Sequence, residues 1–135
     1  MDLEREIDIL DTFVLPRRRE RFVGFLRAPR RRRDFLSELY HFSDFDPACI
    51  VPLAGACDSA PGLVAELLRR GAPRTCYVVS VDARLDGITA DLAGVIDRVF
   101  AKVDGTLVSC VPGRLAYYEG EAPDNRFILE RVRRR

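Results

Sequence analysis

Residues 76–81 constrain the fold of this chain more than any other stretch. They read Cys-Tyr-Val-Val-Ser-Val, a nearly continuous apolar run that is rich in β-branched residues and too short for a helix. A run of this kind is typical of a strand that is covered on both faces. Two more β-rich runs follow at residues 106–111 and 115–118. The sequence therefore predicts a sheet core within residues 75–118, on which the rest of the chain packs.

The first 43 residues have helical periodicity and contain no segment that is typical of a strand. In residues 2–14, apolar side chains recur every three or four positions and form one stripe. Pro16 is expected to end this helix, and Pro29 separates a second predicted helix, over residues 17–27, from a third over residues 29–42. We expect residues 1–43 to form a helical layer that covers a sheet built from residues 49–132.

Strands and helices are predicted to alternate in the middle of the chain. A short strand at 49–53, which Pro52 places at a sheet edge or strand end, precedes a helix over 63–70. The strand at 76–81 precedes a helix over about 89–102. Strands that are separated by helices typically run parallel and are joined by right-handed crossovers. The pattern therefore predicts parallel strand pairing in this region.

The C-terminal strands have no helices between them and are expected to return antiparallel. Pro112 and Gly113 favour a type II turn, so a bulge or a longer loop is expected there. Residues 127–132 are predicted to form an edge strand, and 133–135 a solvated tail. The predicted fold class is thus α/β: one domain over 1–135, with a three-helix layer on a mixed sheet, β-α-β-α-β followed by a β-meander.

Composition narrows the classes of protein to which the chain can belong. A net charge of +1, with 47% apolar and 32% charged residues, is typical of a soluble globular protein, and no apolar run is long enough to cross a membrane. The acidic, amphipathic N-terminus does not resemble an export signal, so a cytoplasmic location is expected. The four cysteines lack a Cys-x-x-Cys pair, which predicts reduced thiols and no metal site. No cofactor is predicted.

Four charged residues are candidates for catalysis because they lie on loops that follow the predicted strands. They are Asp58, Asp82, Arg84 and Asp86. In open parallel sheets such loops meet at one edge, where converging carboxylates bind Mg²⁺ or perform acid–base chemistry. Turn and cap formation explains the same aspartates equally well. A small enzyme, or an anion- or metal-binding protein that uses these loops, is therefore one alternative.

An arginine-rich segment is the second candidate. Nine arginines lie between Phe13 and Arg33, where the single acidic residue is Glu20. Clusters of this kind contact phosphates without regard to sequence, and the candidate anion-binding residues are Arg17, Arg18, Arg30 and Arg31. Four successive helical residues point in different directions, however, and pairing with nearby carboxylates is the competing interpretation. Weak nucleic-acid binding is therefore a further alternative, which the sequence does not favour.

Tyr117 and Tyr118 are adjacent in a predicted strand, so their side chains point to opposite faces. One is expected in the core, and the other is a candidate partner contact if its face of the strand is exposed. No group of residues points to catalysis more strongly than to a structural role. The sequence therefore predicts a non-enzymatic protein-binding or regulatory module, which recognises a protein partner or a second copy of itself.

Overall fold

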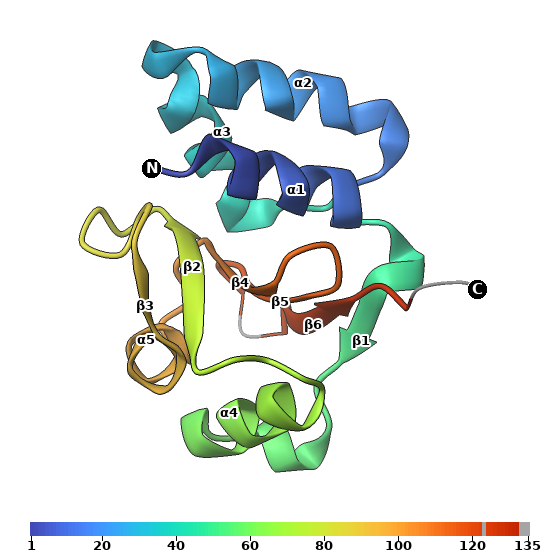
Figure 1. Ribbon diagram of the computed structural model, residues 1–135, viewed down its shortest axis with the longest axis vertical. Coiled ribbons are helices and arrows are strands. Elements are labelled where there is room, and N and C mark those ends of the chain that lie inside the picture. Colours follow the sequence, from blue (N-terminus) through green and yellow to red (C-terminus); the bar gives the residue numbers. More distant parts are fainter. Residues whose placement is uncertain (123, 133–135) are drawn as a thin grey trace.

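The computed structural model describes residues 1–122 and 124–132, in which a six-stranded sheet lies between two helical layers (Figure 1). Helices α1 (Leu3–Phe13), α2 (Pro16–Arg27) and α3 (Arg32–Glu38) cover one face, and α4 (Ala60–Arg69) and α5 (Leu92–Val99) lie against the other. The strands are β1 (Ile50–Pro52), β2 (Thr75–Ser80), β3 (Thr89–Asp91), β4 (Thr106–Val111), β5 (Leu115–Glu119) and β6 (Arg126–Glu130). Their order across the sheet is β1-β6-β5-β4-β2-β3.

The predicted N-terminal helical layer is confirmed. Asp2 caps α1, because its carboxylate accepts a hydrogen bond from the backbone N–H of Arg5. Pro16 occupies the first position of α2, where a missing N–H costs little. The third helix is shorter than predicted: α3 is flanked by 3-10 turns at Pro29–Arg31 and Leu39–His41. The predicted tail at 133–135 lies outside the described residues.

Alternating side chains of the central strands divide the interior into two cores. The residues of β2 that face the helical layer are Tyr77 and Val79, whereas Cys76 and Val78 face α4 and α5. The prediction that this strand is covered on both faces is confirmed, since residues 76–80 are all buried. Six buried phenylalanines lie in the core under the helical layer, and five of them have ring centroids 4.5–6.5 Å from another phenylalanine ring: Phe22, Phe25, Phe35, Phe42 and Phe45.

The predicted parallel strand pairing is wrong, because every strand pair in the described residues is antiparallel. The difference originates at residues 89–91, which were expected to begin a helix but form β3 beside β2. Gly87, with a φ of +76°, closes the connecting turn and donates its N–H to the carbonyl of Val78. One additional strand before α5 reverses the chain direction. As a result, β4 returns antiparallel to β2.

The C-terminal meander is confirmed, including an irregularity near its first turn. The pairing of β4 with β5 shifts register between Ser109 and Val111, as expected for a bulge, and Gly113 has a φ of +72°. The prediction that the last strand lies at the edge is wrong, because β6 is paired on both sides, with β5 and β1. Strand β1 occupies the edge instead, which agrees with the position of Pro52.

Candidate functional site on helix α5

The four residues proposed for catalysis do not converge. Asp82 and Arg84 lie together: Arg84 Nε is 3.2 Å from Asp82 Oδ1, and Arg84 Nη2 is 3.1 Å from Oδ2. These side-chain bonds, with one from the Arg84 backbone N–H, hold the pKa of Asp82 below its usual value. Asp86 is turned toward the helical layer, and Asp58 is exposed ahead of α4. Within residues 1–122 and 124–132, no three His, Cys, Asp or Glu side chains are grouped as a metal site would require.

Asp86 belongs to a buried network that joins the helical layer to the sheet. The guanidinium of Arg32 donates two hydrogen bonds to the Glu6 carboxylate, at 2.6 and 2.8 Å, and two to Asp86, at 3.0 and 2.9 Å. Burial alone would lower the pKa of Arg32, but these bonds raise it above its ordinary value. The Tyr77 hydroxyl also donates to Glu6. Every polar group of this network has a partner, which indicates a structural role.

Tyr117 and Tyr118 are both fully buried, so neither ring is available to a partner at the surface of the chain. The condition for a partner contact therefore does not hold, because β5 is an internal strand that is covered on both faces. The Tyr117 hydroxyl donates to Glu119 Oε1 at 2.8 Å, whereas that of Tyr118 donates to the carbonyl of Leu39. Both hydroxyls thus hold the fold together.

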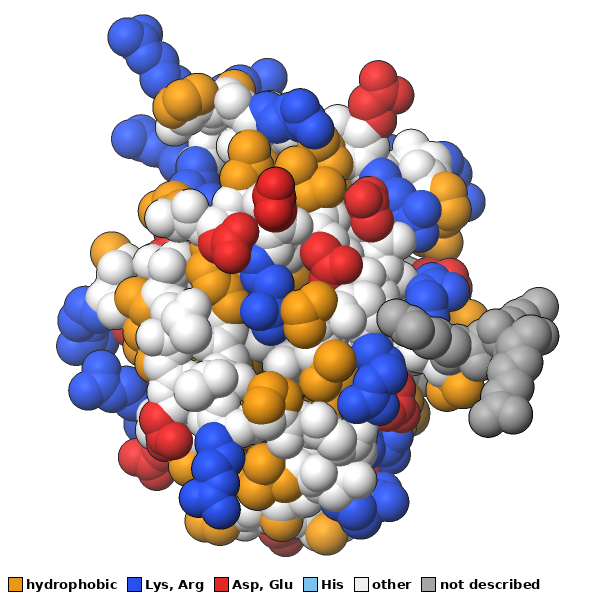
Figure 2. Space-filling model, viewed as in Figure 1, with side chains coloured by type: hydrophobic (Ala, Val, Ile, Leu, Met, Phe, Trp, Pro, Cys, Tyr) orange, Lys and Arg blue, Asp and Glu red, His pale blue; other side chains and the backbone are white. Residues whose placement is uncertain are grey.

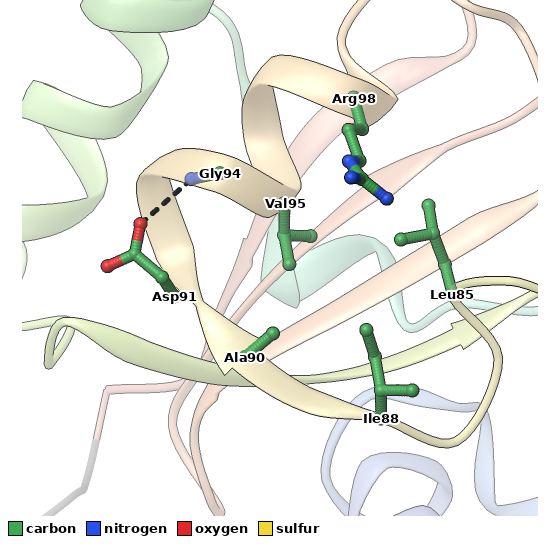
Figure 3. A pocket seen from close by; sticks show the side chains of 7 residues that line it. All are labelled: Leu85, Ile88, Ala90, Asp91, Gly94, Val95 and Arg98. Carbon is green, nitrogen blue, oxygen red and sulfur yellow. Dashed lines mark hydrogen bonds between the residues drawn. The ribbon is translucent and has the colours of Figure 1, made fainter.

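Three hollows in the described surface border helix α5. Asp91 caps the helix, because its Oδ2 accepts a hydrogen bond of 3.0 Å from the N–H of Gly94 (Figure 3). The inner face of α5 fills the core with Leu92, Val95, Ile96 and Val99. The outer face exposes Ala93, Gly94, Asp97 and Arg98. Three hollows border this outer face, which we call the α5 face.

The first hollow lies between α5 and the loop that joins β2 to β3. It has a volume of about 270 Å³, and its walls include the apolar side chains of Leu85, Ile88, Ala90 and Val95. The Arg98 side chain extends from α5 toward Leu85, so a guanidinium lies at the margin of an apolar surface (Figure 3). This hollow is small and open to solvent.

The second hollow is a groove of about 590 Å³ between α4 and α5. Small and apolar residues line it from both helices: Ala60, Pro61, Val64, Ala65, Leu68, Ala93 and Gly94, with Asp97 at one side. Leu68 is 44% exposed, which is unusual here because most large apolar side chains are buried. Gly94 lines both the groove and the first hollow, so the two adjoin at this residue.

The third hollow is polar and holds about 370 Å³, with Asp82, Arg84, Asp97, Arg98 and Lys102 in its walls. Arg98 and Lys102 are four residues apart, and neither lies within 4 Å of a carboxylate in the described part of the chain. The α5 face therefore combines an apolar groove with two basic side chains that form no ion pair within 4 Å among the described residues, although Asp82 and Asp97 line the same hollow.

Sequence reasoning found Asp82 and Arg84 but missed the α4–α5 groove beside them. The signal was present in Ala93 and Gly94, small residues at positions where an exposed helix usually carries long polar side chains. Only the packing of α5 against α4 shows that these positions border a groove.

Comparisons with known proteins leave the site to be interpreted from its geometry. The chain matches no protein-family model, no curated protein and no solved structure. Across residues 1–122 and 124–132, no helix has the length and apolar character that crossing a membrane requires.

Proposed function

We propose that this protein is a non-enzymatic binding module and that its α5 face docks a partner protein. The observation that carries the proposal is the apolar α4–α5 groove, which adjoins the first hollow at Gly94 and lies near Arg98 and Lys102, two basic side chains without an ion pair within 4 Å in the described chain. The buried polar groups, by contrast, are engaged in bonds that hold the fold together. Apolar grooves that are rimmed by polar residues are typical of protein recognition.

The partner that best fits this surface is an amphipathic helix with acidic residues on one flank. A groove between two helices accepts the apolar stripe of a third, and small residues such as Ala65 and Ala93 allow its backbone to approach closely. Arg98 and Lys102 then attract carboxylates on the flank of that helix. Complementary charge of this kind accelerates association and fixes the orientation of the bound helix.

Gly94 offers a way to block the site without disturbing the fold. A Cβ atom at this position would meet only Asp91 Oδ2, at 3.6 Å, which is ordinary van der Waals contact. Glycine in a helix interior is less favourable than alanine by roughly 0.5–1 kcal/mol, so the fold does not require Gly94. Gly24 in α2 is a matched control, since a Cβ atom there would meet nothing within 4 Å and the residue lies on the opposite helical layer.

The test compares Gly94→Gln with Gly24→Gln by NMR titration. The probes are three synthetic amphipathic helices that share one apolar face and differ only in an acidic, neutral or basic flank. We expect the acidic peptide to shift the amide signals of α4 and α5 in the native chain and in Gly24→Gln. In Gly94→Gln these shifts should fall at least tenfold at equal peptide concentration, because the new side chain occupies the groove.

Two results would overturn the proposal. One is equal binding of the acidic and basic peptides, since charge complementarity requires a preference. The other is unchanged binding by Gly94→Gln, provided that the melting temperatures of both glutamine variants confirm that they are folded.

A further inference from the structure

The helical layer carries a second charged surface, on the opposite side of the sheet from the α5 face. Of the nine arginines in the 17–33 segment, five are engaged by other groups: Arg18, Arg19, Arg21, Arg31 and Arg32. The side chains of the other four approach no carboxylate within 4 Å among the described residues: Arg17, Arg27, Arg30 and Arg33. Three of these four lie where α2 leads into α3. We call Arg27, Arg30, Arg31 and Arg33 the α2–α3 corner.

The buried member of the run orients the exposed ones. The sequence predicts that residues 30–33 cannot all share one face, and in the structure Arg32 alone turns inward, to Glu6 and Asp86. Its side chain is 16% exposed, whereas Arg30, Arg31 and Arg33 are exposed. A directional network of four hydrogen bonds thus anchors the middle of the run and leaves its neighbours facing solvent.

A second contact fixes part of this surface. The guanidinium carbon of Arg31 lies 4.6 Å from the centroid of the Phe25 ring, and that of Arg21 lies 5.3 Å from it. Figure 2 shows Lys and Arg side chains gathered at the upper left, at the end of the helical layer where α2 leads into α3 in Figure 1. Asp34, paired with Arg31, offsets only one of the four charges of the corner.

We infer that the α2–α3 corner binds the phosphate backbone of a nucleic-acid duplex without reading its sequence. Guanidinium groups suit phosphate oxygens because they donate paired hydrogen bonds and remain charged. A membrane fits the corner less well, because none of the exposed large apolar residues lies in α2 or α3: Met1, Leu3, Tyr40, Leu68 and Val132. Single strands fit less well too, since Tyr40 is the one exposed aromatic residue in the described chain and stacking needs several.

The test measures how binding of a 20-base-pair duplex depends on salt, with two unrelated sequences. If three or four phosphates are neutralised, the slope of log K against log salt is about −3, and affinity falls on the order of 100-fold between about 50 and 200 mM salt. The variant Arg27→Gln/Arg30→Gln/Arg33→Gln should reduce the slope to near zero. Because these side chains have no carboxylate partners, the melting temperature should not fall.

The matched control removes three other basic side chains, on the far side of the molecule, as Arg74→Gln/Arg98→Gln/Lys102→Gln. It has the same net charge as the corner variant and should retain the native slope. Equal loss of binding by both triple variants would overturn the proposal, since it would show that binding depends on net charge and not on the position of the arginines. So would tighter binding to anionic phospholipid vesicles, or to inorganic polyphosphate, than to the duplex. The duplex test does not depend on the α5 face, so a failure of peptide binding there would not change the result expected for the corner.

Discussion

The two helical layers cover opposite faces of one sheet, but different interactions hold them there. Buried polar groups tie the helical layer to the strands: Arg32 bridges Glu6 and Asp86, and Arg5 Nε donates to Ser109 Oγ at 3.0 Å. On the other face, α4 and α5 rest on a largely aliphatic core that contains three of the four free cysteines, Cys57, Cys76 and Cys110. Arg70 at the end of α4 also bonds to Glu130 of β6, so within this layer it is α5 whose described side chains contact the sheet by apolar packing alone.

Among the described residues on the α5 side, the Glu119 carboxylate bonds to the loop that follows α5 and makes no hydrogen bond to the helix. The buried Glu119 carboxylate accepts hydrogen bonds from the backbone N–H groups of Ala101 and Val103, at 3.0 and 2.9 Å. Both residues have positive φ values, 62° and 55°, which L-amino acids rarely adopt. The carboxylate thus stabilises a strained loop, and α5 is located by that loop and by its apolar inner face.

This difference explains why the two proposed surfaces differ in kind. Directional hydrogen bonds fix the rotation of a helix, so the arginines around Arg32 project in a defined array. Apolar contact is not directional, and the small residues between α4 and α5 leave a groove that is not filled. An array of charges suits a polyanion, whereas an open groove suits a helix.

Breaking the Arg32 network should have the largest effect on stability. In Arg32→Met the apolar stem is kept, but the carboxylates of Glu6 and Asp86 are left buried without a cation. We expect the free energy of unfolding to fall by about 3–5 kcal/mol, as measured by urea denaturation. The control Arg31→Met removes an exposed ion pair with Asp34 and should cost less than about 1 kcal/mol.

A further variant separates the lost charge from the lost packing. Arg32→Met/Glu6→Gln/Asp86→Asn removes the uncompensated carboxylates, so it should recover most of the stability lost in Arg32→Met. Equal costs for Arg32→Met and Arg31→Met would contradict the view that directional bonds hold the helical layer.

Alkaline pH should destabilise both layers at once. Burial raises the pKa of Tyr118, Cys76 and Cys110 to about 12, and it raises the pKa of Tyr77 and Tyr117 still further. Unfolded thiols and phenols ionise near pH 8.5 and about 10. Because the folded values are raised, the associated stability is fully present below the unfolded values and is lost as pH rises toward the folded ones.

We therefore expect the urea midpoint to fall steadily above pH 9. Phenolate absorbance at 295 nm should appear in full only together with the loss of far-ultraviolet circular dichroism, since three of the four tyrosines are buried. Full phenolate absorbance in a chain that is still folded would be the contrary outcome.

The smallest expected changes in stability are those of glycine substitutions in α5 and in the loop that follows it, which should have opposite signs. Ala101→Gly replaces an exposed residue at φ 62°, so it should stabilise the chain by about 0.5–1 kcal/mol through relief of backbone strain. Ala93→Gly, at an exposed position in α5, should destabilise it by about the same amount because glycine disfavours the helix. Thermal denaturation of the two variants measures the difference. Changes of the same sign would show that the loop is not strained.

Sequence periodicity was sufficient to predict most of the helices and strands but not how they are arranged in space. The helical periodicity of α1, the proline between α1 and α2 and the continuous run at residues 76–80 are local signals, and each element they predicted is present. The buried face of α1 differs from the predicted stripe, because Leu3 is exposed and Ile9 and Phe13 are buried. Strand β3 has only three residues, Thr89–Asp91, and no such signal. Because β3 was not predicted, β4 was expected to run parallel to β2, whereas it runs antiparallel. The loops that were expected to meet at one edge of the sheet therefore do not meet there.

For the candidate sites too, contacts within one segment could be predicted from the sequence and contacts between distant segments could not. Asp82 and Arg84 are close in sequence, and their contact could be anticipated, whereas the inward turn of Asp86 depends on Arg32, 54 residues away. Burial of both tyrosines in β5 depends on the helices that cover the two faces of the sheet, because Tyr118 lies in the core under α1–α3 and Tyr117 in the core under α4 and α5.

What the sequence determined by itself was where helices and strands form, because side-chain periodicity and caps act over a few residues. The tertiary structure decided the strand directions, the separation of the arginines into one buried anchor and several exposed charges, and the groove beside Gly94. These features arise from packing between distant segments, where burial and charge pairing are settled by which surfaces meet.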